Sequence, residues 1–301
     1  MRRFLVKLVV FAMIFFLVEK VLAVFLYIAP SKEKDKRLEY VINGQINKEI
    51  IILGSSRGAR NIIASQIADS VKQTCYNLAY PGSDIEFHEF VLRSLLRFNK
   101  KPQLVILAVD DPSELLPNES INFRLERLYP LVKYEYITDE LIKRSEKNFL
   151  AKFLVLGRIN KSNFDLREKH FTPVDSIKAD GSMPIYFQRK DIKLTYEEKP
   201  QLYPMKDELP VKIQAFQAFQ NLCEINHIKL LIVFSPNFKR HNLAFENRLR
   251  QVSSPTVSFY RYDTLNQVYH DNAYFYDQSH LITKGAVIFT NEIITEIRKN
   301  R

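Results

Sequence analysis

The side chains that could perform nucleophilic chemistry stand at two distant places in the sequence. Ser55 and Ser56 follow the apolar run 50–53, and Asp277 and His280 stand three residues apart near the C-terminal end. A carboxylate at this spacing can fix the tautomer of an imidazole and leave its other nitrogen to take the proton of a serine hydroxyl. We therefore expect a Ser-His-Asp relay if the fold brings the two places together.

The stretch 49–57 predicts how the serines are held. Its four aliphatic residues end at Gly54, a pattern typical of a strand buried on both faces inside a parallel sheet. Gly54 permits a sharp exit, and a helix is expected from Gly58 onward. The free N–H groups at a helix start can receive negative charge. The same stretch is also compatible with a serine that only caps the helix.

Beyond this stretch, apolar runs of strand length alternate with segments of helical periodicity. The alternation predicts a three-layer α/β fold with a doubly wound parallel sheet over residues 49–301. Within it, residues from about 112 to 209 break the alternation and predict an insertion with mixed helices that packs over the sheet edge. The predicted strands are 50–53, 75–80, 104–109, 229–236 and 257–262, and the predicted helices are 58–71, 84–98, 211–226, 243–251 and 283–297.

The N-terminal residues 1–30 predict a membrane anchor, because the stretch 4–28 is apolar over about the length that a spanning helix needs. Glu19 and Lys20 interrupt it, so an interfacial helix is one alternative, and a cleavable signal peptide is another. Residues 26–30 lack a small-x-small cleavage site. We expect an uncleaved single-pass anchor, a polar tether at 31–48, and a catalytic domain outside the cytoplasm.

Composition narrows the class of partner. The formal net charge is +10 and the pI about 9.4, but basic residues alternate with acids and no zinc-finger or RNA-binding signature accompanies them. This pattern favours a basic surface near anionic lipid or polymer over nucleic-acid binding. Cys75 and Cys223 lie far apart and are predicted to be core residues.

Three motifs in order resemble the SGNH/GDSL hydrolase superfamily. Gly54-Ser55-Ser56 is similar to its first block, with Ser55 in the usual Asp place; the segment 77–82 (Asn-Leu-Ala-Tyr-Pro-Gly) resembles the second, and Asp277-x-x-His280 the fifth. The resemblance implies a flavodoxin-like fold in which Ser56 is the nucleophile, His280 the base and Asp277 its orienting carboxylate. It also implies an oxyanion hole formed by the N–H groups of Ser56 and Gly82, and neither a cofactor nor a metal.

The sequence departs from the family pattern at two positions. Ala79 stands where a glycine is common, and Asp110 stands where the third block has an oxyanion-hole Asn. An ionised carboxylate cannot donate a hydrogen bond, and loss of one oxyanion donor typically lowers the rate about 100- to 1,000-fold. Arg57 is a candidate substitute donor. Arg57, Asp110 and Asp111 are all candidates for substrate contact.

Three functions remain open from the sequence. The anchor, the GSSR-type first block and the insertion resemble an envelope-associated branch of the superfamily, which implies an esterase or O-acyltransferase acting on an acylated cell-envelope polysaccharide or lipid. The alternative is an inactive or weakly active scaffold within a polysaccharide modification or export complex. A phosphoryl-transfer enzyme that uses Asp110 and Asp111 with a divalent metal is the third.

Overall fold

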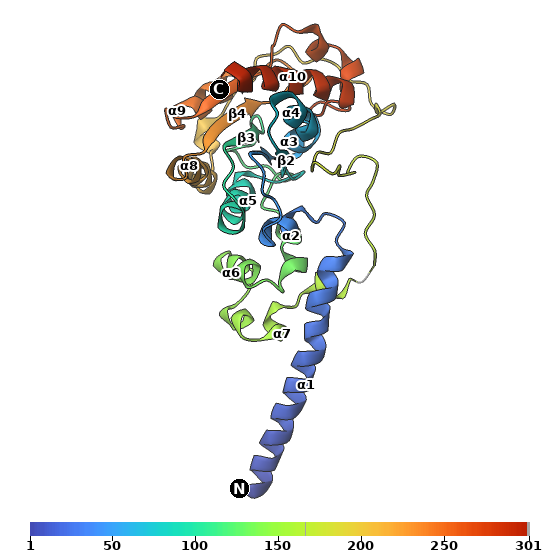
Figure 1. Ribbon diagram of the computed structural model, residues 1–301, viewed down its shortest axis with the longest axis vertical. Coiled ribbons are helices and arrows are strands. Elements are labelled where there is room, and N and C mark those ends of the chain that lie inside the picture. Colours follow the sequence, from blue (N-terminus) through green and yellow to red (C-terminus); the bar gives the residue numbers. More distant parts are fainter. Residues whose placement is uncertain (166, 300–301) are drawn as a thin grey trace. The chain divides into compact units, whose positions relative to one another are not determined.

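The computed structural model describes residues 1–165 and 167–299 and contains two compact units (Figure 1). One unit combines Met1–Glu39 with Arg124–His170, and the other, an α/β unit, combines Tyr40–Phe123 with the chain from Phe171 onward. The expected insertion is therefore divided. Its central part groups with the N-terminal helix, whereas its two ends, and the last residues of the expected tether, belong to the α/β unit.

The α/β unit is built on a parallel sheet, which confirms the predicted fold class. Among the described residues the sheet has five strands in the order β2-β1-β3-β4-β5. Every neighbouring pair is parallel, so all carboxyl ends lie at one edge. The strands are β1 (Ile50–Gly54), β2 (Cys75–Asn77), β3 (Leu104–Val109), β4 (Lys229–Phe234) and β5 (Ser258–Arg261).

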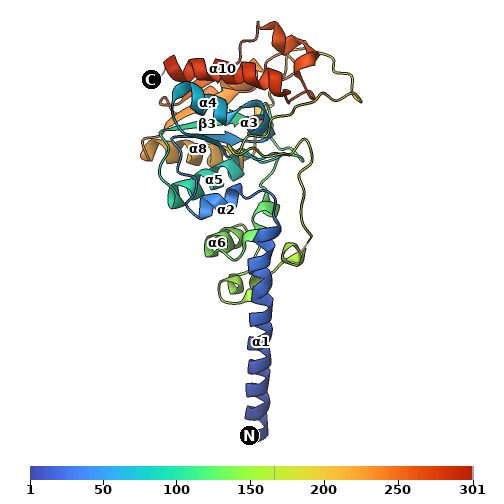
Figure 2. The same ribbon diagram turned by 45° about the vertical axis from the view of Figure 1, so that its right-hand side comes forward.

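Helices cover both faces of this sheet, as Figures 1 and 2 show. On one face, Ile52 and Ile106 belong to a buried cluster with Ile67 of α4 and Phe289 of α10. Helices α5 and α8 pack over the other face. Cys75 and Cys223 are both buried, as predicted, and both are free thiols, a point that the sequence left open. The helices of the α/β unit are α3 (Ser56–Asn61), α4 (Ala64–Val71), α5 (Ile85–Phe98), α8 (Pro210–Ile225), α9 (Leu243–Gln251) and α10 (Thr283–Lys299), and α2 (Arg37–Ile42) joins the two units.

The single helix predicted at 58–71 is wrong, because the chain forms α3 and α4 with a break between them. Ile62 and Ile63 are extended. The side chain of Asn77 donates to the Ile62 carbonyl at 3.0 Å, and the Ile63 N–H donates to Thr290 Oγ1 at 3.1 Å. These long-range partners satisfy the backbone of the break, so tertiary structure overrides the helical periodicity of the sequence.

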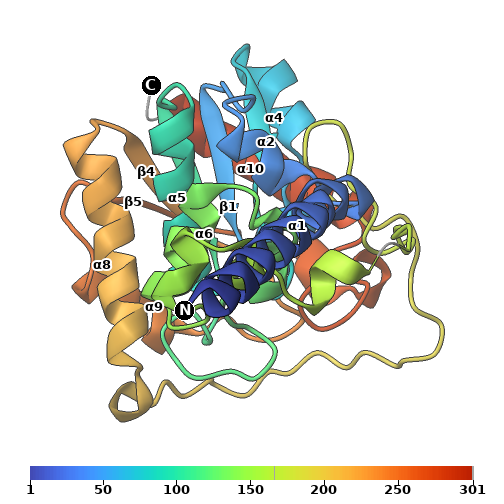
Figure 3. The ribbon, with the colours of Figure 1, turned by 90° about the horizontal axis from the view of Figure 1, so that it is seen from below.

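The other unit is organised by α1 (Arg2–Lys32), which is long and apolar enough to cross a membrane. Short helices of residues 124–170 gather beside α1 (Figure 3). Ion pairs connect the residues after α1 to the segment 124–170. Asp35 binds Arg37 and Arg127, and Glu39 binds Lys133. The short helices are α6 (Glu135–Lys143) and α7 (Val155–Arg158), with 3-10 turns η1 (Leu125–Arg127), η2 (Tyr129–Leu131), η3 (Phe149–Lys152) and η4 (Lys161–Phe164).

Candidate active site

The end of β1 sets the position of Ser56. Gly54 has a φ of +137°, and a Cβ atom placed there would lie 2.5 Å from the Ala108 carbonyl oxygen, so only glycine fits this exit. Ser55 is the N-cap of α3, and its hydroxyl accepts the Arg57 N–H at 3.4 Å. Ser56 is the first residue of the helix. The two serines therefore divide the two roles that the sequence left open: Ser55 caps the helix, and the hydroxyl of Ser56 is available for chemistry.

The structure brings Ser56, His280 and Asp277 together, although 224 residues separate the serine from the histidine. His280 Nε2 lies 2.7 Å from Ser56 Oγ, and Nδ1 lies 2.8 Å from each Asp277 carboxylate oxygen. Asp277 Oδ1 also accepts the backbone N–H of Ser279 and of His280. Both imidazole nitrogens are thus held, with the carboxylate on one side and the hydroxyl on the other.

The environment of the imidazole favours its neutral form. Burial lowers the pKa of His280 below its usual value, and the nearby positive charges of Arg60 and Arg57 lower it further, against the opposing effect of Asp277. Burial alone would raise the pKa of Asp277. The hydrogen bond from His280 and the two backbone N–H groups outweigh it and leave that pKa lowered. A neutral imidazole beside an ionised carboxylate is the arrangement that a general base requires.

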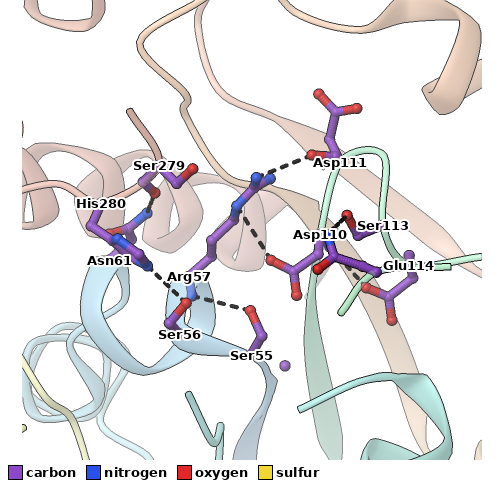
Figure 4. A network of polar contacts seen from close by, with 12 residues as sticks. Ser55, Ser56, Arg57, Asn61, Asp110, Asp111, Ser113, Glu114, Ser279 and His280 are labelled. Carbon is purple, nitrogen blue, oxygen red and sulfur yellow. Dashed lines mark hydrogen bonds and ion pairs between the residues drawn. The ribbon is translucent and has the colours of Figure 1, made fainter. Parts of the chain in front are cut away.

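Asn61 fixes the loop that carries His280, and sequence analysis did not identify this role. Its Nδ2 donates to the Ser279 carbonyl at 3.3 Å (Figure 4), and its Oδ1 accepts the Leu281 N–H at 2.9 Å. The side chain is completely buried. Because Asn61 belongs to α3, the helix that begins with Ser56 also holds the backbone on both sides of the histidine.

The turn that contains Gly82 lies beside the end of β1. The Ser83 N–H bonds the Tyr80 carbonyl at 3.1 Å, and Gly82 has a φ of +73° behind Pro81, as a tight turn of type II requires. The Tyr80 N–H and the Ser83 hydroxyl both donate to the Gly54 carbonyl. Among the described residues, neither the Ser56 N–H nor the Gly82 N–H has an acceptor.

Ala79, one of the two departures from the SGNH/GDSL pattern that the sequence resembles, has a local explanation. A Cβ atom placed on Gly58 would lie 2.9 Å from Ala79 Cβ, a contact closer than real Cβ atoms make. The alanine and the glycine therefore form one close contact between α3 and the segment after β2. In this chain the small residue that permits the approach is Gly58.

Arg57 is bound by the carboxyl end of β3. Its Nε lies 3.3 Å from Asp110 Oδ1, and an Nη donates to the Asp111 carbonyl at 3.1 Å (Figure 4). Burial raises the pKa of Asp110, and the positive charge of Arg57 opposes that rise. Lys239 approaches Asp111 at 3.9 Å. The three residues expected to contact substrate thus form one buried cluster next to the Ser56 helix.

Behind this cluster runs a second polar network that the sequence did not reveal. The Asp110 N–H donates to Glu114 at 2.8 Å, Glu114 lies 3.4 Å from His88 Nδ1, and His88 Nε2 lies 2.9 Å from the Ser83 hydroxyl. All four residues are buried. The network connects the loop after β3 with the Gly82 turn. His88 lies within an apolar helical face in the sequence, so no local pattern could have identified its partners.

Several buried polar atoms of this region have no hydrogen-bond partner within the described part of the chain. They include Arg57 Nη1, Asp110 Oδ2, both carboxylate oxygens of Asp111, Ser235 Oγ and Asn237 Oδ1. Ser235 and Asn237 follow β4, the strand next to β3, so these atoms come from adjacent strand ends. His88 Nδ1 and Glu114 Oε1 belong to the same group of unpaired atoms, because their 3.4 Å contact is not a hydrogen bond. Buried polar groups are almost always paired, and a group of unpaired ones calls for a polar partner. Within residues 1–165 and 167–299, no group of His, Cys, Asp and Glu side chains could hold a metal ion.

The comparisons with known proteins give no information about the site. No family model and no curated protein matches. Among solved structures, the chain is similar to a candidate acylhydrolase from Bacteroides fragilis, with 12% identity and a TM-score of 0.41 over 89% of this chain and 99% of the other. A similarity at this level says nothing about the site, whose interpretation depends on its own geometry.

Proposed function

We propose that this chain is a serine esterase or O-acyltransferase of the SGNH type. The observation that carries the proposal is the continuous hydrogen-bonded row from Ser56 through His280 to Asp277. A buried, neutral imidazole between a hydroxyl and a carboxylate is the arrangement that activates a serine nucleophile. The row starts at the first residue of a helix, where unpaired N–H groups can bind an oxyanion.

The proposed reaction proceeds through an acyl-enzyme. Ser56 Oγ attacks the acyl carbonyl while His280 Nε2 takes its proton, and the N–H groups of Ser56 and Gly82 bind the oxyanion that forms. The imidazolium then gives the proton to the leaving alcohol oxygen as the carbon–oxygen bond breaks. Water or a sugar hydroxyl, deprotonated by His280, attacks the acyl-Ser56 carbonyl, and the serine recovers its proton. Asp277 keeps the imidazole oriented throughout.

The unpaired polar atoms beside Ser56 support a polyhydroxylated substrate. Carboxylate oxygens of Asp110 and Asp111 can accept hydrogen bonds from hydroxyl groups, and Arg57 can donate them. We therefore propose an acylated cell-envelope polysaccharide or lipid as the substrate, with envelope polysaccharide-modification proteins as partners. Comparing products with and without an acceptor glycan would distinguish an acyltransferase from an esterase.

A serine-reactive fluorophosphonate tests the proposal on the full-length protein in detergent. We expect the probe to label Ser56, and Ser56→Ala to abolish the label. Ser55→Ala is the matched control, because the neighbouring hydroxyl serves as a helix cap and its loss leaves the nucleophile in place. A wild-type protein that is folded and never labelled would contradict the proposal.

A catalytically weak or inactive scaffold is the second candidate, and Asp110 is the observation that favours it. A carboxylate bound by Arg57 stands where the family pattern has a donor, so the oxyanion hole lacks one hydrogen bond. Complementation separates the two functions. A Ser56→Ala protein that restores the cellular role of a deletion strain would favour the scaffold, whereas failure with normal protein levels would favour the enzyme.

We also propose that α1 anchors the protein in a membrane with the α/β unit outside the cytoplasm. The full-length chain should resist extraction by carbonate, and its release would contradict a spanning helix. For orientation, Leu202→Cys places a thiol at an exposed position, while the two native cysteines are buried. Labelling of this variant in intact cells by a membrane-impermeant maleimide is expected. Labelling only after lysis would reverse the orientation.

A further inference from the structure

The unit built on α1 carries an exposed apolar patch outside that helix. Its members are Phe149 and Leu150 of η3, Phe153 and Leu156, with 61%, 52%, 69% and 47% of their surfaces exposed. Phe149 and Phe153 pack edge to face, with ring centroids 5.3 Å apart. Large apolar side chains grouped within eight residues are unusual on a water-exposed surface and mark an interaction site. We call this set the 149–156 patch.

Helix α1 itself has two parts. None of residues 2–18 is buried, and Figures 1 and 2 show this half of the helix without neighbours from its own unit. Later in the helix, Leu26 and Ala29 are buried and Phe25 contacts Phe164. At a rise of about 1.5 Å per residue, residues 2–18 are roughly 26 Å long, close to the shortest length that spans a bilayer. Arg2 and Arg3 stand at the outer end of this stretch, and Lys7 lies within it.

Glu19 marks the junction of these two parts, and it also holds the 149–156 patch. Its carboxylate oxygens accept the backbone N–H groups of Val155 and Leu156 at 2.7 and 3.0 Å. The charge that interrupts the apolar helix is thus used to bind α7. The C-terminal end of the patch is therefore bound at the point where the bare part of α1 ends, within the same unit.

The backbone and the charges of the segment both place it at the membrane surface. Irregular backbone is not tolerated inside hydrocarbon when it faces lipid, so η3 and the turns around α7 cannot lie deep in the bilayer. Residues 139–161 contain six Lys or Arg residues and three acidic residues, and two of the basic side chains, Arg144 and Lys152, pair with Glu140 and Asp139. Lys143 and Lys161 are exposed. Basic side chains around an apolar patch suit the anionic headgroup region.

We propose that the 149–156 patch inserts into the interfacial region of the same bilayer that α1 enters, with the membrane boundary at the level of Glu19. The occupant of the patch is lipid. The unit thus contacts the membrane at two points, through the spanning helix α1 and through the 149–156 patch in the interfacial region. Two contacts restrict the rotation and tilt of α1 in a way that a single helix cannot.

The absence of tryptophan from this chain allows a direct test. Phe153→Trp places a single tryptophan in the patch, and the full-length variant is reconstituted into vesicles with and without brominated acyl chains. Phe11→Trp reports on the bare half of α1, and Leu202→Trp, at an 88% exposed position of the α/β unit, is the water-exposed control. We expect the Trp emission maximum of the Phe153 variant to lie at shorter wavelength than that of the Leu202 variant. We also expect the brominated lipid to quench this emission strongly.

The outcomes separate lipid from other occupants. Quenching of the Phe153 and Phe11 variants, with none for the Leu202 variant, supports the proposal, and Leu150→Trp should behave like Phe153→Trp. Quenching of the Phe11 variant alone overturns it. A blue shift of the Phe153 variant without quenching also overturns it, because the patch would then be covered by protein, either a second copy or a partner. If neither variant is quenched, both proposals are wrong: α1 does not span the bilayer, and the 149–156 patch does not enter its interfacial region.

Discussion

Two polar clusters flank the Ser56 helix, and they differ in how completely they are satisfied. In the cluster of His280 and Asp277, each imidazole nitrogen has a partner, and the carboxylate accepts backbone N–H groups as well. In the cluster of Arg57, Asp110 and Asp111, several buried atoms have no partner among the described residues. The first cluster is fully hydrogen-bonded without any substrate, which agrees with the proposal that it positions the reacting groups. The second leaves buried polar atoms without a partner in the described chain, and we propose that a polar group of the substrate pairs with them.

Removal of the Ser56 hydroxyl or the His280 imidazole should lower kcat more than any other single change. Ser56→Ala and His280→Ala should each lower kcat on a simple acetyl ester by about a million-fold, as expected when groups act as a unit. The double variant should be little worse than either single one. Steady-state kinetics of the three proteins tests this, and multiplicative losses would show that the two groups act independently.

Asp277→Asn should have the next largest effect, a loss of about 10,000-fold in kcat, because the amide favours the wrong imidazole tautomer. The amide can still occupy the same space, so folding should be unaffected. The thermal midpoint of the variant provides the control. A loss of only a few-fold would show that the carboxylate charge is not required, and that a side chain held by the backbone N–H groups of Ser279 and His280 orients the imidazole without it.

Asp110→Asn tests the incomplete cluster. If this side chain faces the oxyanion, the amide supplies the missing donor and kcat should rise by up to about 100-fold. Asp111→Asn is the matched control, because Arg57 contacts the carbonyl of Asp111 and not its carboxylate. An equal response of the two variants would assign both aspartates to substrate binding, with no special place for Asp110.

The smallest expected effect is a displacement of the pH profile. His280 must be neutral to act as a base, and its pKa is lowered by burial and by Arg60 and Arg57. The acid limb of kcat/KM should therefore lie below the ordinary histidine pKa of about 6.5, with activity lost as the pH falls through it. Arg60→Gln removes one positive charge and should move this limb to higher pH. A displacement to lower pH would contradict the electrostatic assignment.

The features that could be predicted from the sequence are those that depend on local residue patterns. Strands β1, β3 and β4 are short, continuous apolar runs with polar ends, so their place and the polar groups after them could be predicted. The relay depends on Asp277 and His280, three residues apart, and this local spacing was visible. Asn61, His88 and Glu114 were missed because their partners lie far along the chain, and nothing in their neighbourhood indicates a hydrogen bond.

Local sequence patterns also gave wrong predictions where distant side chains replace the local hydrogen bonds of a helix. Ile62 and Ile63 continue the apolar periodicity of a helix, but Asn77 and Thr290 bind their backbone in an extended form. Likewise, composition indicated that the segment 112–209 is folded, but could not show that its central part groups with the N-terminal helix. Both outcomes depend on contacts between remote residues, which periodicity does not encode.

The side chain of Asn61 has a consequence for how the site opens. It joins the helix that begins with Ser56 to the backbone on both sides of His280. The loop therefore cannot detach by local unfolding unless α3 releases the Leu281 N–H. The exchange rate of that one amide proton with deuterium is then a measure of how often nucleophile and base separate, and it can be recorded without any substrate.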